Sequence, residues 1–228
     1  MFGVPLQTPF DLRFVLFKIP ISVTPFFWLI AFLFSSGGNH NLPMFIVIRM
    51  FAIFLSILVH EMGHAMVIRY IFGAQPYVIL HGFGGLTFHD RPYYYRTPKS
   101  WGQILISFAG PAAGFLFSFV FWVIYAVFSD KVSTNEYLLI LLGNFIIIGI
   151  IWGILNLMPV YPLDGGQISR EICHLISPRH GIRVSLVISV VVAIALALLA
   201  LKSGDTFLAI LFGFLAYGSI QMLQTRQY

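Results

Sequence analysis

The residues best placed to do chemistry form one H-E-x-x-H motif at positions 60–64. On an α-helix, two histidines four residues apart lie on the same face, about 6 Å apart, so both imidazoles can reach one metal ion. Zinc binds imidazole nitrogen at about 2.0–2.1 Å and keeps a water in catalytic sites. The motif therefore predicts a zinc-activated water, with His60 and His64 as ligands and Glu61 as the general base.

A catalytic zinc ion takes three protein ligands, so a third must come from elsewhere in the chain. Most acidic residues lie in loops or near helix ends, but Asp164 stands out in the segment N-L-M-P-V-Y-P-L-D-G-G-Q, residues 156–167. Two prolines break a helix there, and Gly165 and Gly166 give the backbone freedom to turn. We therefore expect Asp164 to be the third ligand candidate.

The elements that must hold these residues are membrane helices. Of the 228 residues, 59% are hydrophobic and 9% are charged, whereas soluble domains carry about 25% charged residues. A chain this apolar requires the lipid bilayer as its solvent. The formal net charge of +5 forms no basic stripe, which argues against nucleic acid as a partner. A single cysteine, Cys173, excludes an internal disulfide or a thiolate metal cluster.

Six apolar stretches reach membrane-spanning length. They lie at residues 19–35, 43–72, 101–128, 137–158, 182–201 and 206–224. We predict one all-α polytopic membrane domain over residues 1–228, with a catalytic core at about 43–167 and the other spans as accessory helices. The stretches 13–24 and 77–88 do not resemble simple helices. Each predicts a strand or a re-entrant hairpin near the inner face, with an ordinary cytoplasmic loop as the alternative.

The basic residues predict the orientation in the membrane. With the N-terminus in the cytoplasm, Lys131 and Lys202 fall on the outer side, and Arg49 lies in the outer part of the second span. Ten fall on the inner side: Arg13, Lys18, Arg69, Arg91, Arg96, Lys99, Arg170, Arg179, Arg183 and Arg226. This bias predicts that both termini are cytoplasmic and that His64 and Asp164 share the inner half of the membrane.

Three motifs together resemble the site-2 protease family of intramembrane zinc metalloproteases. They are H-E-x-x-H in the second span, Ala109-Gly110-Pro111 in the third, and N-x-x-P-x-x-P-L-D-G-G at the end of the fourth. The chain is similar to the compact six-span members of the sporulation-factor protease type, which have no PDZ or CBS domain. The resemblance implies one Zn²⁺ per chain on His60, His64 and Asp164, with Glu61 as the base, in a cell-membrane site open to the cytoplasm.

The same resemblance implies that the substrates are single-span or membrane-tethered proteins or peptides. They would be cut in regulated intramembrane proteolysis or in the clearance of signal-peptide remnants. It also implies that Asn156 contacts the substrate or the site. Gly84 and Gly85, in the β-rich stretch, are further substrate-binding candidates, and His81 and His89 flank them. Many family members carry an asparagine three residues after the Gly-Pro proline, where this chain has glycine, so polar support from the third helix is in doubt.

Other interpretations remain open at the level of sequence. A catalytically silent protein could hold zinc and bind single-span partners, although it would not need Glu61. A metal or proton transporter could use the same cluster, but transporters often show repeated halves, and only one half of this chain carries ligands. Cys173 and His174 fit an interfacial turn or short helix better than extra ligands. The small residues 110–114 fit a close-packing surface.

Overall fold

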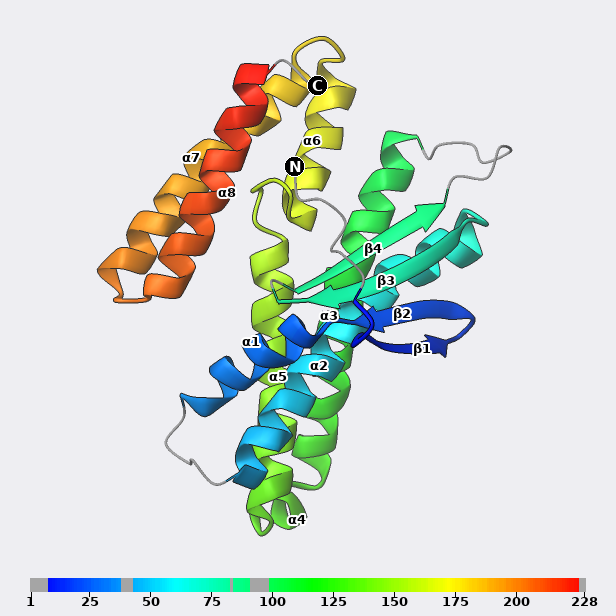
Figure 1. Ribbon diagram of the computed structural model, residues 1–228, viewed down its shortest axis with the longest axis vertical. Coiled ribbons are helices and arrows are strands. Elements are labelled where there is room, and N and C mark those ends of the chain that lie inside the picture. The colour runs from blue at the N-terminus through cyan, green and yellow to red at the C-terminus, as the bar shows by residue number, and fades with distance from the viewer. Residues whose placement is uncertain (1–7, 38–42, 83, 91–98, 226–228) are drawn as a thin grey trace. The chain divides into compact units, whose positions relative to one another are not determined.

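The computed structural model describes residues 8–37, 43–82, 84–90 and 99–225 (Figure 1). Its elements are β1 (Leu12–Leu16), β2 (Ile19–Val23), α1 (Pro25–Ser36), α2 (Pro43–Met66), the π-helix η1 (Val67–Ile71), β3 (Gln75–His81), β4 (Gly84–Asp90), α3 (Ser100–Val127), α4 (Ser129–Ser133), α5 (Glu136–Asn156), α6 (Asp164–Ile176), α7 (Gly181–Lys202) and α8 (Thr206–Thr225).

The chain divides into two compact units, which we describe separately. The first contains Phe2–Arg96 and Ala109–Gly153, and the second contains Thr97–Phe108 and Ile154–Tyr228. Helices α3 and α5 therefore each begin in one unit and end in the other. The predicted domain covering residues 1–228 stays a prediction.

The first unit contains a four-stranded sheet in the order β1-β2-β3-β4. β1 pairs antiparallel with β2, β2 parallel with β3, and β3 antiparallel with β4. Phe17 and Lys18 form the two-residue turn of the first hairpin, both with positive φ (49° and 61°), as tight hairpin turns require. Both stretches that we predicted to be strands or hairpins, 13–24 and 77–88, are thus confirmed as strands.

The sheet buries one face against the helices of its own unit. Ile19, Ile21 and Val23 of β2 are at most 1% exposed and alternate with more exposed residues. Together with Val78 and Leu80 of β3, they pack against side chains of α1 and α2. This period-two pattern fits a half-buried strand. The sheet is therefore fixed to the helix that carries the H-E-x-x-H motif.

Five helices are long and apolar enough to cross a membrane in the described part of the chain. They are α2 with its π-helical extension, α3, α5, α7 and α8, and each matches a predicted span. The predicted span at 19–35 is wrong as a single helix. Its first residues alternate and form β2, and Pro25 then starts the 12-residue helix α1, about 18 Å long against a hydrocarbon core of about 30 Å.

Three hydrogen bonds locate some of the basic residues used for the topology. The Lys18 carbonyl accepts hydrogen bonds from Arg69 Nη1 (3.2 Å) and Gln75 Nε2 (3.1 Å), so the N-terminal hairpin lies at the η1–β3 end of α2. Arg49 donates a hydrogen bond to the Ser35 carbonyl at 3.1 Å. Its positive charge is also favourable there, because the C-terminal end of a helix carries partial negative charge. Arg91, Arg96, Arg226 and His40 lie outside the described residues.

In the second unit, α7 and α8 form an antiparallel helical hairpin, coloured orange to red in Figure 1. Val160, from the segment between α5 and α6, is fully buried against Ala193 of α7 and against Phe212, Leu215 and Ala216 of α8. The segment that leads to Asp164 is therefore packed against both accessory helices.

Candidate metal and catalytic site

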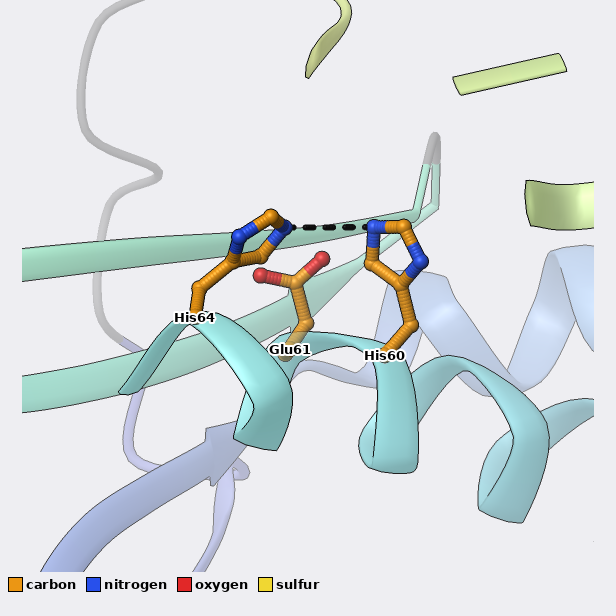
Figure 2. A group of neighbouring side chains, drawn as sticks. All are labelled: His60, Glu61 and His64. Atoms are coloured by element: carbon orange, nitrogen blue, oxygen red, sulfur yellow. Dashed lines mark hydrogen bonds between the residues drawn. The ribbon is translucent and has the colours of Figure 1, made fainter. Parts of the chain in front are cut away.

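His60, Glu61 and His64 lie in the last turns of α2 and are 2%, 4% and 6% exposed, respectively. Figure 2 shows both imidazole rings turned toward one another, with the Glu61 carboxyl group between them. The ring centroids are 5.0 Å apart and the rings cross at 79°. One ligand atom from each of the three residues lies within 4.8 Å of the others. The helix spacing thus produces the convergence that the sequence predicts.

The two histidines have the spacing that one zinc ion requires. Their Nε2 atoms lie 3.3 Å apart. Two nitrogen ligands at 2.0–2.1 Å in a tetrahedral arrangement would be separated by about 3.3 Å. The same distance also suits a hydrogen bond between the two rings, which is the alternative. Two buried imidazoles at this spacing are ligands that zinc prefers, so the residues present fit the ion.

Two neighbouring elements approach this site so closely that only glycine fits. A Cβ atom added to Gly85 of β4 would overlap the Glu61 carboxyl group, and one added to Gly110 of α3 would overlap the His64 ring. At Gly63 an added Cβ would lie 2.8 Å from that of Ala113. The close-packing surface that we predicted on the third span therefore packs α3 directly against a candidate zinc ligand.

Gly84 and Gly85 have different surroundings. Gly84 has a φ of +121°, and a Cβ there would lie 2.7 Å from the Trp152 indole. Trp152, from α5, also packs edge-on against His60 at 6.4 Å between ring centroids. Gly85 instead faces Glu61. The substrate-binding role expected for both glycines stays a prediction.

Thr87 is a polar contact of the site that the sequence analysis missed. Its Oγ1 lies 2.7 Å from Glu61 Oε2 and 3.2 Å from the Glu61 carbonyl oxygen. Residues two apart on a strand lie on the same face, so a strand with Gly85 against Glu61 also turns Thr87 toward it. Side chains in β4 alternate between the two faces of the sheet. This alternation would have identified Thr87 as a neighbour of Glu61 once α2 was known to pack against that face.

His81 and His89 lie toward opposite ends of the β3–β4 hairpin, where His81 pairs with Gly84 and His89 with Pro76. Burial lowers the pKa of His81 below its usual value, which keeps the ring neutral near pH 7. A functional role for either histidine stays a prediction. Cys173 and His174 lie within α6, in agreement with the short helix that we expected.

Asp164 is the first residue of α6, in the second unit, and is 8% exposed. A helix N-terminus favours a negative charge, and a carboxylate must be ionised to bind a metal. Gly165 and Gly166 lie in the first turn of α6, and a Cβ on either would overlap the backbone of residues 157–161. We expected these glycines to give the backbone freedom to turn. In the structure they allow the first turn of α6 to approach the backbone of residues 157–161 closely.

A chain of buried hydrogen bonds anchors the segment before Asp164. The Tyr161 N–H donates to Ser189 Oγ of α7 at 2.7 Å, and Ser189 Oγ lies 2.9 Å from Ser219 Oγ of α8. Both serines are 1% exposed. An unsatisfied backbone group in a membrane interior costs several kcal/mol. These hydrogen bonds therefore stabilise the conformation of the segment before Asp164.

The first unit brings together His60, Glu61 and His64. Asp164 and Asn156 belong to the second unit. Their roles as third zinc ligand and substrate contact therefore stay predictions.

Fold and site define a multi-pass membrane protein with a buried H-E-x-x-H motif that fits a metal ion. A family model described as Peptidase family M50 matches residues 130–200. A solved structure, the site-2 protease from Methanocaldococcus jannaschii, is similar with a TM-score of 0.61 and 25% identity, covering 94% of this chain and 95% of that one. The chain is thus similar in sequence and in fold to the site-2 protease family.

Three curated relatives agree with this placement. The chain is 28% identical to zinc metalloprotease MJ0392 of M. jannaschii over 191 residues, covering 84% of this chain and 52% of that protein. It is 29% identical to stage IV sporulation protein FB of Bacillus subtilis over 150 residues (66% and 46%). It is 32% identical to putative zinc metalloprotease Rip3 of Mycobacterium tuberculosis over 126 residues (55% and 30%). The chain thus spans about half the length of the relatives it matches, or less.

Substituting Gly110 tests the close contact at His64. In Gly110→Ala the new methyl group occupies the space of the ring, so we expect zinc affinity to fall by about tenfold or more, as when a ligand's support is lost. Gly114→Ala is the matched control on the same helix, because its Cβ would meet the Gly149 carbonyl at an ordinary 3.5 Å. Zinc affinity is measured on purified protein against a competing chelator. Equal zinc affinities in Gly110→Ala and Gly114→Ala would contradict the close contact between Gly110 and the His64 ring.

Substituting Ser189 tests the anchor of the Asp164 segment. Ser189→Ala leaves a buried N–H and a buried hydroxyl without their partner, at a cost of about 1–3 kcal/mol. We expect faster hydrogen exchange over residues 157–168, measured by mass spectrometry in detergent. Ser185→Ala is the control, because that hydroxyl bonds Ile182 within its own helix (2.8 Å). The anchor is refuted if the two variants exchange alike in this segment.

Proposed function

We propose that this chain is an intramembrane zinc metalloprotease that hydrolyses peptide bonds of single-span or membrane-tethered substrates. The observation that carries the proposal is the convergence of two buried imidazoles, 3.3 Å apart at Nε2, with the Glu61 carboxyl group beside them. A site that only holds a metal does not need such a carboxylate. The similarity to zinc metalloproteases supports the same reaction.

In this proposal His60, His64 and Asp164 would hold one zinc ion per chain. The ion supplies Lewis acidity, since it polarises a carbonyl and makes water more acidic. Glu61 accepts the proton of the attacking water and returns it to the leaving amine. Trp152 packs edge-on against His60 and covers one side of its ring. Water would reach the site from the cytoplasmic side.

The substrate would bind as an extended strand. A helix hides its carbonyl groups in internal hydrogen bonds, so a membrane-spanning substrate must unwind locally before it is cut. β4 is an outermost strand of the sheet, and an edge strand can pair with an added peptide. Gly85 brings β4 against Glu61, so a peptide added there would lie beside the base. Gly84, Gly85 and Asn156 are the substrate contacts that we propose.

The site would face the cytoplasm, with both termini on that side of the cell membrane. Pairing of β2 with β3 puts the N-terminal hairpin, with Arg13 and Lys18, in the same sheet as the segment after α2. This supports the grouping of basic residues on one side. The short helix α1 then returns the chain toward the start of α2, where Arg49 contacts its end.

Removing the base tests the reaction. We expect Glu61→Gln to retain zinc but to lose about 10²–10⁴-fold in cleavage of a tagged single-span substrate, because the amide cannot accept a proton. Glu136→Gln, an exposed acid in the first turn of α5, is the control and should cleave normally. Cleavage is followed by immunoblot after co-expression. If wild type and Glu61→Gln bind substrates equally and neither cuts, the protein is a zinc-holding scaffold.

Removing the metal and its third ligand tests the zinc site. We expect a chelator to abolish cleavage and added zinc to restore it, with one zinc ion per chain by elemental analysis. Asp164→Ala should weaken zinc binding by at least about tenfold. Asp205→Ala should not, since that carboxylate caps the start of α8 by accepting from the Leu208 N–H (3.0 Å). Wild-type affinity in Asp164→Ala would mean that the third ligand lies elsewhere.

A further inference from the structure

The hydrogen bond between Thr87 and Glu61 has no part in zinc binding or in the proton transfers above. Thr87 Oγ1 lies 2.7 Å from Glu61 Oε2 and 3.2 Å from the Glu61 carbonyl oxygen. A hydroxyl group has one proton to donate, and the shorter contact is to the carboxylate. We propose that Thr87 is a positioning residue that holds the general base and ties it to the edge strand. This inference rests on the proposed function.

β4 restrains Glu61 at two points. Gly85 brings the strand backbone against the Glu61 side chain, and Thr87, two residues further along the same face, engages one carboxylate oxygen. Threonine suits this role because its branched side chain is stiff at χ1. With Oε2 accepting from Thr87, Oε1 is the oxygen that takes the proton of the water. The restraint therefore selects both the orientation of the carboxyl group and the atom that reacts.

The position of Thr87 is itself fixed by the buried centre of the sheet. Thr87 pairs with Val78 of β3, and Val78 pairs with Ile21 of β2. Both partners are 1% exposed. A shift of one residue in this register would turn Thr87 to the opposite face. The N-terminal hairpin thus contributes to catalysis at a distance, since β2 pairs with β3, and β3 in turn pairs with the strand that contacts the base.

The edge position of β4 gives this contact a second consequence. A peptide pairing with the open side of β4 takes its register from the same strand that fixes Glu61. One hydroxyl therefore links the position of the scissile carbonyl to the position of the base. Loss of the hydroxyl should disturb the chemical step while the backbone pairing of the substrate remains. We expect a lower kcat with little change in KM.

Thr87→Val removes the hydroxyl and keeps the shape, and Thr87→Ser restores the hydroxyl. Thr24→Val, directly after the end of β2, is the control, because the buried Thr24 hydroxyl has no hydrogen-bond partner in the described part of the chain. The variants are compared as the whole 228-residue chain, loaded with zinc, with a tagged single-span substrate. We expect Thr87→Val to lose roughly 10- to 100-fold in kcat at normal zinc content. Thr87→Ser should recover most of this loss, and Thr24→Val should match wild type.

Infrared difference spectra provide a readout that does not need cleavage. The carboxylate band that disappears in Glu61→Gln should shift in Thr87→Val, return in Thr87→Ser and stay in place in Thr24→Val. An unshifted band, an unchanged kcat or a rise in KM alone would each overturn the proposal. A shifted band in a protein that cuts nothing would support the contact and count against the proposed function.

Discussion

The constraint on which this structure depends is the burial of three ionisable side chains inside an apolar helix. An isolated charge in such an environment is expensive, and so is a polar group without a partner. The structure meets this cost by bringing the three groups together, with Nε2 atoms 3.3 Å apart and a threonine hydroxyl on the carboxylate. A divalent cation would offset it further, since both imidazoles could donate a lone pair to it. The need for a metal and the need to satisfy buried polar groups therefore lead to the same arrangement.

A sheet within a membrane protein is subject to a related constraint, because lipid cannot satisfy the hydrogen bonds of its backbone. Here β1 and β2 supply partners for one side of the β3–β4 hairpin, and α1 and α2 cover the buried face. Among the described strands, β1 and β4 are the outermost, so each has one side that no strand of this sheet pairs. β4 also contacts Glu61 through Gly85 and Thr87, so in the proposed function the strand that can pair with an extended substrate is the one that contacts the base. Unpaired backbone groups of an edge strand are costly, and pairing with an extended substrate would satisfy them. The same pairing would hold the substrate in the extended form that proteolysis requires.

Local patterns predicted much of the fold and the site. The i, i+4 spacing of His60 and His64 is a property of one helix, so their convergence followed without any tertiary information. Strands were expected at 13–24 from partial alternation and at 77–88 from β-rich composition, but hydropathy summed over 19–35 also predicted a span that does not exist as one helix. Thr87 was missed because its contact joins residues 26 positions apart, on a strand and a helix. Such a contact depends on sheet register and on the space left by Gly85.

The accessory helices also acquire a physical role from the second unit. The segment before Asp164 contains two prolines, and backbone groups left unpaired by proline are costly in an apolar setting. Ser189 and Ser219 provide the polar partners, and Val160 fills an apolar contact between α7 and α8. A helical hairpin of only apolar residues could pack against this segment but could not satisfy the Tyr161 N–H. Two small hydroxyl residues on adjacent spans therefore determine the path by which the chain reaches Asp164, and α7 and α8 act as a scaffold for the proposed third ligand.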